Sequence, residues 1–125
     1  MKDNCIKIEE DEVLLTPLDE NKVISYLKER FEENRVKSIY DDMITVLSIV
    51  EKHYKGSYQY FTLSYEGKFD SHKKDFIYIV VYIKPSISVD KEFEMYMNVI
   101  DEIGKYEEKN LLYSCIPFDI YTVFL

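Results

Sequence analysis

The sequence of 125 residues contains no tryptophan and no alanine, and it has only three glycines, three prolines and two cysteines. The scarcity of glycine and proline argues against a flexible linker, so the sequence predicts one domain over residues 1–125. No uncharged apolar run approaches the roughly 18 residues of a membrane-spanning helix. The first ten residues also lack the apolar segment of a signal peptide. We therefore expect a single cytoplasmic domain with no membrane contact.

The cysteines are too few and too far apart for a disulfide scaffold or a zinc site. Cys5 and Cys115 are separated by 110 positions, and neither has a second cysteine or a histidine at metal-binding spacing. The sequence predicts two reduced thiols that behave as small hydrophobic side chains, and no metal or cofactor. A disulfide between the two is the alternative, because intracellular disulfides occur in hyperthermophiles.

The charged composition is typical of a thermophile. Fourteen lysines and fourteen glutamates stand against a single glutamine, and thermophilic proteins favour charged side chains over thermolabile amides. Lysine, isoleucine and tyrosine are abundant while alanine, glycine and arginine are scarce, a bias expected from an AT-rich genome. We therefore expect an archaeal or archaeal-virus source, an expectation about origin that carries no statement about function.

The formal net charge of −8 disfavours nucleic-acid binding, because an acidic surface repels a phosphate backbone. The one local exception is the segment from Lys68 to Lys74, where three lysines and His72 surround Phe69. Asp70 and Asp75 dilute this basic cluster. The segment is therefore predicted to be a solvated loop, with nucleic-acid contact as the lesser alternative.

Three helices are predicted from caps and apolar spacing. The first begins at the Thr16-Pro17 pair, a hydroxyl cap followed by a proline in the first turn, and extends to about Asn34. The second carries a wide apolar stripe over residues 36–54, stops at Gly56, and exposes Asp42 with other charged residues on its opposite face.

The third helix is predicted between a cap at Ser88 or Asp90 and about Asn110, with Phe93 and Met97 on its buried face. Strands are predicted over residues 58–66, 76–83 and 118–125, and over 5–8 or 13–16 near the N-terminus. The apolar run 76–83 is typical of a central strand buried on both faces. The sequence thus predicts an α+β domain of ferredoxin-like β-α-α-β-β-α-β order, with a mainly antiparallel sheet and helices on one face.

Catalytic patterns are incomplete. Gly56-Ser57, followed by Asp75 and Asp119 at the starts of two strands, resembles nucleotidyltransferases of the polymerase-β type. That resemblance implies phosphate binding and two magnesium ions, but Ile77 occupies the place of the second aspartate of the Asp-x-Asp pair. A nuclease of the restriction-endonuclease type has an acidic residue followed by Glu-x-Lys at the end of a central strand. Glu66-Gly67-Lys68 has this spacing but lies in a predicted turn.

Lys84, at the end of the central strand, suits the lysine of that nuclease pattern, but Tyr82 occupies the position of its glutamate. His53, in the last turn of the second helix, is predicted to be structural, because no nucleophile or acid accompanies it at a catalytic spacing.

Tyrosine is the most distinctive residue, with twelve in the chain and a concentration around the two central strands. The alternation of side chains along a strand places Phe61, Leu63 and Tyr65 on one face of the sheet, with Tyr58 and Tyr60 toward the other. If a tyrosine-rich face is uncovered, it forms a recognition surface, since tyrosine contributes large contact area at interfaces; if covered, it is core. The predicted binding residues are Tyr58, Tyr60, Tyr65, Tyr78 and Tyr82.

Three classes of function are compatible with the sequence. The favoured class is a non-enzymatic, inhibitor-like or regulatory protein that binds a protein partner through the tyrosine-rich sheet face and acidic helices, with a homodimer as its expected assembly. The second is a metal-dependent phosphotransferase or nuclease using Asp75 and Asp119, with Asp70 or Glu66 as further ligands. The third is a small-molecule sensor with its ligand between sheet and helices.

Overall fold

The computed structural model describes residues 6–8, 13–68, 76–114 and 118–125, with the side chains of 6–8 and 66–68 left aside. It contains three helices and one sheet in the predicted α+β order, with the N-terminal strand split in two. The strands are β1 (Ile6–Ile8), β2 (Val13–Leu14), β3 (Tyr58–Lys68), β4 (Phe76–Ile83) and β5 (Phe118–Phe124). The helices are α1 (Glu20–Lys28), α2 (Glu33–Tyr54) and α3 (Val89–Glu108).

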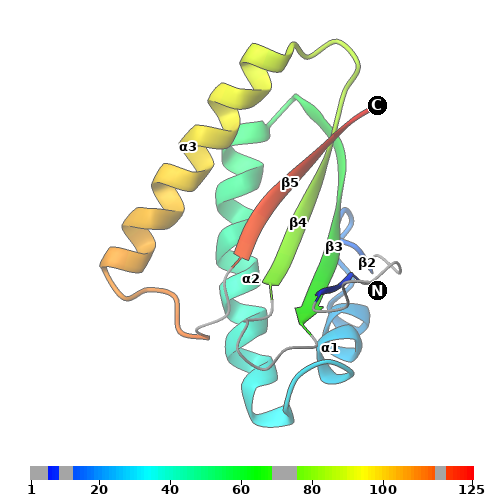
Figure 1. The fold of residues 1–125 in the computed structure, drawn as a ribbon, viewed down its shortest axis with the longest axis vertical. Helices are drawn as coiled ribbons and strands as arrows, with labels where there is room; N and C mark the ends of the chain where they lie inside the picture. The colour runs from blue at the N-terminus through cyan, green and yellow to red at the C-terminus, as the bar shows by residue number, and fades with distance from the viewer. Residues whose placement is uncertain (1–5, 9–12, 69–75, 115–117) are drawn as a thin grey trace.

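The sheet has the order β1-β3-β4-β5, and β2 pairs with the same edge of β3 as β1 (Figure 1). β3 and β4 form an antiparallel pair, whereas β4 and β5 run parallel. Parallel neighbours need a crossover connection, and α3 supplies it. The predicted central position of residues 76–83 is confirmed, because β4 lies between β3 and β5.

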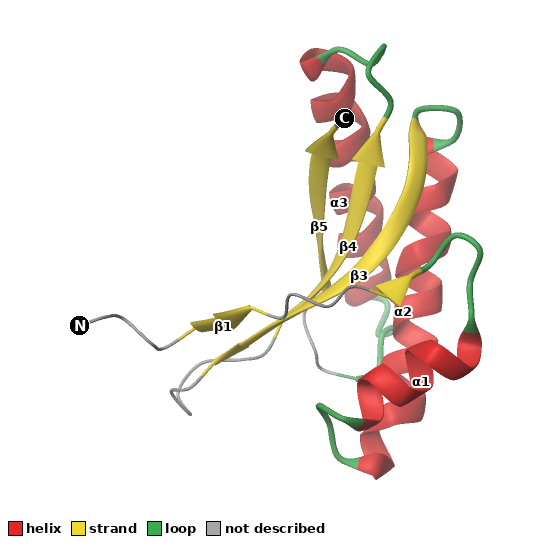
Figure 2. Cartoon of the chain, turned by 90° about the vertical axis from the view of Figure 1, so that its right-hand side faces the viewer, coloured by secondary structure: helices red, strands yellow, loops and turns green. Residues whose placement is uncertain are grey.

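The three helices cover one face of the sheet, and no described helix lies on the other face (Figure 2). The side chains of β4 divide accordingly. Ile77, Ile79, Val81 and Ile83 are buried in the core against the helices, but Phe76, Tyr78 and Tyr82 on the opposite side are only partly buried. The prediction that this strand is buried on both faces was therefore wrong, because aromatic rings with polar tips occupy the face without helices.

The start of the first helix differs from the prediction. Asp19, and not Thr16, is the N-cap: its side chain accepts a hydrogen bond of 3.2 Å from the backbone N–H of Lys22. The Thr16 hydroxyl instead accepts the N–H of Phe61 at 2.9 Å, which fastens the segment before α1 to β3. The helix also ends earlier than expected, at Lys28.

The second helix ends as predicted. After Tyr54 the chain turns through Gly56, whose φ of 83° is a left-handed conformation that glycine adopts without strain. The N–H of Ser57 then donates to the carbonyl of Tyr54 at 2.8 Å, and its carbonyl accepts the N–H of Lys84 at 3.0 Å. Gly56-Ser57 is thus a joint between α2, β3 and the end of β4.

The third helix has its predicted cap but not its predicted buried face. The Ser88 hydroxyl accepts the N–H of Lys91 at 3.1 Å, and α3 ends before Asn110, which adopts a φ of 57°. The buried residues are Glu92, Met95, Val99 and Ile103. Phe93 and Met97, expected to be buried, are exposed by 60% and 46%. No helix that the structure describes is long and apolar enough to cross a membrane.

Candidate functional site

Four tyrosines lie on the face of the sheet that the helices leave uncovered. Tyr60 of β3 is paired in register with Tyr82 of β4, and Tyr78 lies on the same side of β4, four residues from Tyr82. Tyr121 is paired with Val80, so it extends this side onto β5. We call Tyr60, Tyr78, Tyr82 and Tyr121 the tyrosine face.

The rings of the tyrosine face contact one another across the strands. Tyr60 stacks on Tyr82, with ring centroids 4.5 Å apart and an angle of 26° between the rings. Tyr78 meets Tyr121 edge to face at 6.5 Å, and Phe76 lies 6.2 Å from Tyr78. Such pairs add about 0.5–1.5 kcal/mol each beyond the burial of their area. The face is therefore an ordered array of rings rather than a set of independent side chains.

Smaller side chains fill the space among these rings. Thr62 and Val80 are paired in register at the centre of the face, and both are buried. Ser64, paired with Tyr78, is buried as well. The surface thus combines a closed floor of small side chains with aromatic rings above it, and these rings present apolar area to a partner.

Two of the five predicted binding tyrosines lie on the other side of the sheet. A register shift between residues 58 and 60 places Tyr58 against the core, where its ring stacks on Phe61 at 4.1 Å. Its hydroxyl donates to Glu51 at 3.3 Å, and burial followed by the charge of Glu51 raises the pKa of Tyr58. The prediction that Tyr58 lies on the opposite face was wrong, because strict alternation does not account for a bulge.

Tyr65, the other such residue, was correctly expected on the face of Phe61 and Leu63, which is the helix side. Its ring meets Phe31 edge to face at 5.6 Å, and the Arg30 guanidinium lies 5.8 Å from the ring centroid. Tyr58 and Tyr65 therefore do not belong to the tyrosine face. Tyr121, by contrast, was missed, because the register of a parallel pair is set by tertiary packing and leaves no local signal.

The candidate catalytic aspartates are only partly described. Asp75, like His72, Cys5, Cys115 and most of the segment 68–74, lies outside the described residues. Asp119 accepts the N–H of Ile120 on its Oδ1 at 2.7 Å. Burial, and then the charge and a hydrogen bond of Asp119, raise the pKa of Tyr96. Asp119 thus lies between the start of β5 and α3.

His53 takes part in a polar cluster between α2 and α3. Its Nε2 donates to Glu102 Oε1 at 2.7 Å, and Lys52 Nζ lies 3.2 Å from the same oxygen. The hydrogen bond from His53 is the main reason why the pKa of Glu102 is lowered, against an opposing effect of burial. A pocket of 440 Å³ adjoins these residues, with Lys105 and Lys109 on its rim.

One buried carboxylate was not predicted from the sequence. Asp42, expected to be solvated, is only 2% exposed. Its carboxylate accepts the N–H of Tyr113 at 2.9 Å and that of Ser114 at 2.7 Å. The signal was absent because the residues that need these acceptors lie some 71 positions away in the sequence. Asp42 therefore holds the chain that leads into β5.

Among residues 6–8, 13–68, 76–114 and 118–125, no group of three or more histidine, cysteine or acidic side chains is placed to hold a metal ion. No protein-family model matches the chain, and no curated protein or solved structure matches it either. The fold and its surfaces therefore define the class of protein as an α+β domain with an uncovered aromatic sheet face.

Proposed function

We propose that this protein is a non-enzymatic, inhibitor-like or regulatory protein that binds a protein partner through the tyrosine face. The observation that carries the proposal is the array of Tyr60, Tyr78, Tyr82 and Tyr121 on the side of the sheet opposite the helices. Tyrosine is enriched at interfaces because it presents a large amphipathic area and loses little conformational entropy on binding.

The arrangement of charge supports a protein partner whose contacts here are not mainly ionic. Acidic residues of α2 and α3 lie in the helix layer, on the other side of the sheet from the tyrosine face. Several of them are paired with lysines, as Asp41 is with Lys37 and Asp101 with Lys105. The acidic helices can steer a basic partner at long range, but the close contact is assigned to the rings.

A cytoplasmic location and a homodimeric state belong to the same proposal. Two cysteines at opposite ends of the sequence do not form the framework that stabilises small secreted domains. A homodimer would leave the tyrosine face free for a partner if the copies met along an edge of the sheet.

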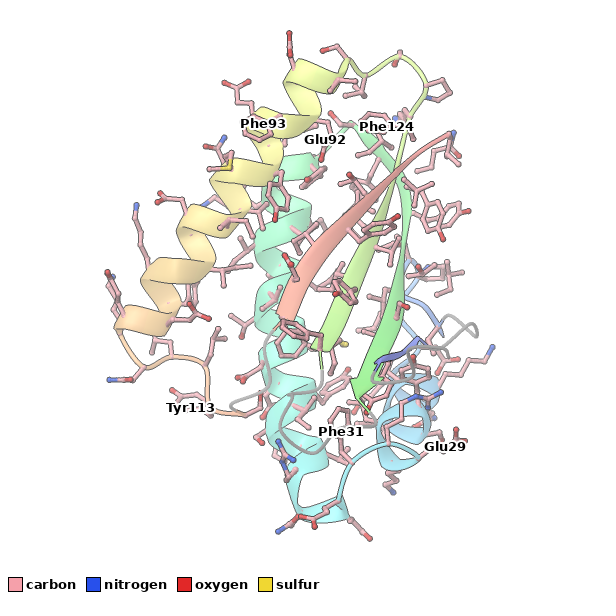
Figure 3. All side chains as sticks on the ribbon, viewed as in Figure 1. Glu29, Phe31, Glu92, Phe93, Tyr113 and Phe124 are labelled. Carbon is pink, nitrogen blue, oxygen red and sulfur yellow. The ribbon has the colours of Figure 1, made fainter. Side chains whose placement is uncertain are left out.

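The test is affinity capture from lysate of the source cells, comparing a variant of the tyrosine face with a matched control. Tyr60→Ser combined with Tyr82→Ser removes the stacked pair of rings. Tyr113→Ser is the control. It removes a tyrosine that is 66% exposed and lies on the connection after α3, not in the sheet (Figure 3).

We expect a stoichiometric protein to be retained by the wild type and by Tyr113→Ser, and to be lost with the double variant while its circular dichroism stays native. Truncation of an interface tyrosine commonly costs more than about 1 kcal/mol, so the loss of two of them is expected to lower the affinity by about tenfold or more. A partner that the double variant retains fully, or a wild type that retains none, would contradict the proposal.

A further inference from the structure

The outer edge of β5 offers unpaired backbone groups. Within the described part of the chain, β5 pairs only with β4. The N–H of Leu125 donates to the carbonyl of Ile83 at 3.2 Å. Because backbone groups alternate in direction along a strand, the N–H and C=O groups of Ile120, Thr122 and Phe124 point away from β4.

This edge lacks the usual protection against pairing. Edge strands are commonly guarded by lysines, prolines, bulges or a very short length. β5 is seven residues long, contains no lysine or proline, and keeps an unbroken register with β4 from Phe118 to Phe124. The N–H of Ile120 is guarded, because it is occupied by the carboxylate of Asp119. Among the residues that the structure describes, none covers the N–H groups of Thr122 and Phe124 in this way.

An apolar flank of α3 adjoins the same edge. Val89, Phe93 and Met97 follow one another at four-residue spacing, so they form a stripe on one side of the helix, and their exposures are 68%, 60% and 46%. Tyr96, three residues beyond Phe93, is close enough to Asp119 of β5 to have its pKa raised. Phe93 and Phe124 also lie at the same end of the molecule (Figure 3).

We propose that β5 pairs antiparallel with β5 of a second copy of this chain, and that the α3 stripes of the two copies pack against each other beneath the joined sheet. Thr122 lies on the two-fold axis and exchanges both hydrogen bonds with Thr122 of the partner subunit. The N–H of Phe124 donates to the carbonyl of Ile120 of the partner subunit. The N–H of Ile120 stays bonded to the Asp119 carboxylate, so Ile120 takes part in the pairing only through its carbonyl.

A second copy fits this edge better than another protein, because the surface complements itself. No charged residue lies between Ile120 and Leu125, and in this register the two Asp119 side chains are about 20 Å apart, beyond the screening length of roughly 10 Å. Stable interfaces remove about 800 Å² from each partner. Five large exposed side chains, Val89, Phe93, Met97, Phe124 and Leu125, contribute to such an area together with the strand edge.

The deciding experiment is sedimentation of the full chain over a wide range of concentration, comparing Thr122→Pro with Thr122→Val. Proline removes the outward N–H and is tolerated on an edge strand, since the bonds to β4 come from other residues. We expect the wild type and Thr122→Val to be dimers. The dissociation constant of Thr122→Pro should be about tenfold higher or more, because the two-fold symmetry removes the same hydrogen bond from both copies.

A second variant and a second readout keep the test decisive if Thr122→Pro fails to fold. Phe93→Ser combined with Met97→Ser alters only exposed side chains and is expected to weaken the dimer. In the wild type, exchange of the Phe124 amide with solvent is expected to slow as concentration rises. More salt is expected to tighten the dimer, because each copy carries −8.

A wild type that stays monomeric, or a dimer indifferent to both variants with unchanged exchange at Phe124, would overturn the proposal. Pairing that appears only when a different protein is added would assign the edge to that protein and overturn it as well. This inference rests on the homodimeric state named in the proposed function and specifies its interface. It can fail without the partner of the tyrosine face, because none of the variants alters Tyr60 or Tyr82.

Discussion

The carboxylate of Asp42 shows how one residue can join distant parts of this chain. It lies in α2 but accepts hydrogen bonds from the N–H groups of Tyr113 and Ser114, just before β5. Its neighbour Asp41 is exposed and forms an ion pair of 3.1 Å with Lys37, four residues away. Two adjacent aspartates with the same chemistry therefore contribute differently to the free energy of unfolding, because only one of them is buried.

Asp42→Ala should lower the free energy of unfolding by about 2–3 kcal/mol, since it leaves two N–H groups without their charged acceptor. The matched control, Asp41→Ala, should cost no more than about 0.5 kcal/mol, the value of an exposed pair at this spacing. Urea denaturation of the two variants measures the difference. Equal costs would show that the Asp42 contacts add nothing to stability.

Glu102 makes the stability of the folded protein depend on pH, and this dependence can be assigned to one side chain. Its pKa in the folded protein is lowered from the ordinary value of 4.5, mainly by the hydrogen bond from His53. A carboxyl whose folded pKa is depressed contributes stability above its unfolded pKa, and that contribution disappears as pH falls through the folded value.

The expected result is that the wild type loses more stability than Glu102→Gln as pH falls from just above 4.5 into the acid range. Asp101→Asn is the control, because Asp101 is exposed and pairs with Lys105 at 3.6 Å. Denaturant titrations at a series of pH values give the comparison. Parallel curves for the wild type and Glu102→Gln would refute the assignment to Glu102.

At the scale of elements, two glycines make opposite contributions. Gly56 ends α2 with a φ of 83°, and Gly104 lies inside α3; a Cβ at either position would meet no atom within 4 Å. Any effect of adding a methyl group is therefore due to the backbone and not to a clash. A side chain at a left-handed position costs about 1 kcal/mol or more, whereas alanine is favoured over glycine inside a helix.

Gly56→Ala should therefore destabilise the protein by about 1 kcal/mol, and Gly104→Ala should stabilise it by about 0.5–1 kcal/mol. Thermal unfolding of both variants tests the signs directly. A stabilised Gly56→Ala would mean that the turn between α2 and β3 can relax to an ordinary conformation.

The sequence predicted the elements better than the faces that they present. Apolar spacing located α2, α3 and the three long strands, because period and length are local properties. It failed at Phe93 and Met97, since Glu92 and Met95 occupy the buried side of α3 instead. Which of two apolar stripes on a helix is buried depends on the packing of its neighbours, and no local pattern encodes that choice.

At the scale of the whole molecule, the α+β class and the one-sided helix layer followed from the order of the elements. The candidate site was only half predicted. Of the five predicted binding residues, Tyr60, Tyr78 and Tyr82 share the uncovered face, whereas Tyr58 was displaced by a bulge; Tyr121 was missed because its place depends on the parallel register. Both failures come from pairings between strands, which a sequence read segment by segment does not contain.

The parallel pairing of β4 and β5 also bears on how the molecule assembles. β3 and β4 are joined by a short stretch of chain, so they can meet early, whereas β5 reaches β4 only after the whole of α3 has been traversed. Until then β4 has a free edge that accepts any strand of the right sequence. In a crowded solution the first such strand can be β5 of another molecule, and the result is a strand-exchanged dimer with native pairing throughout.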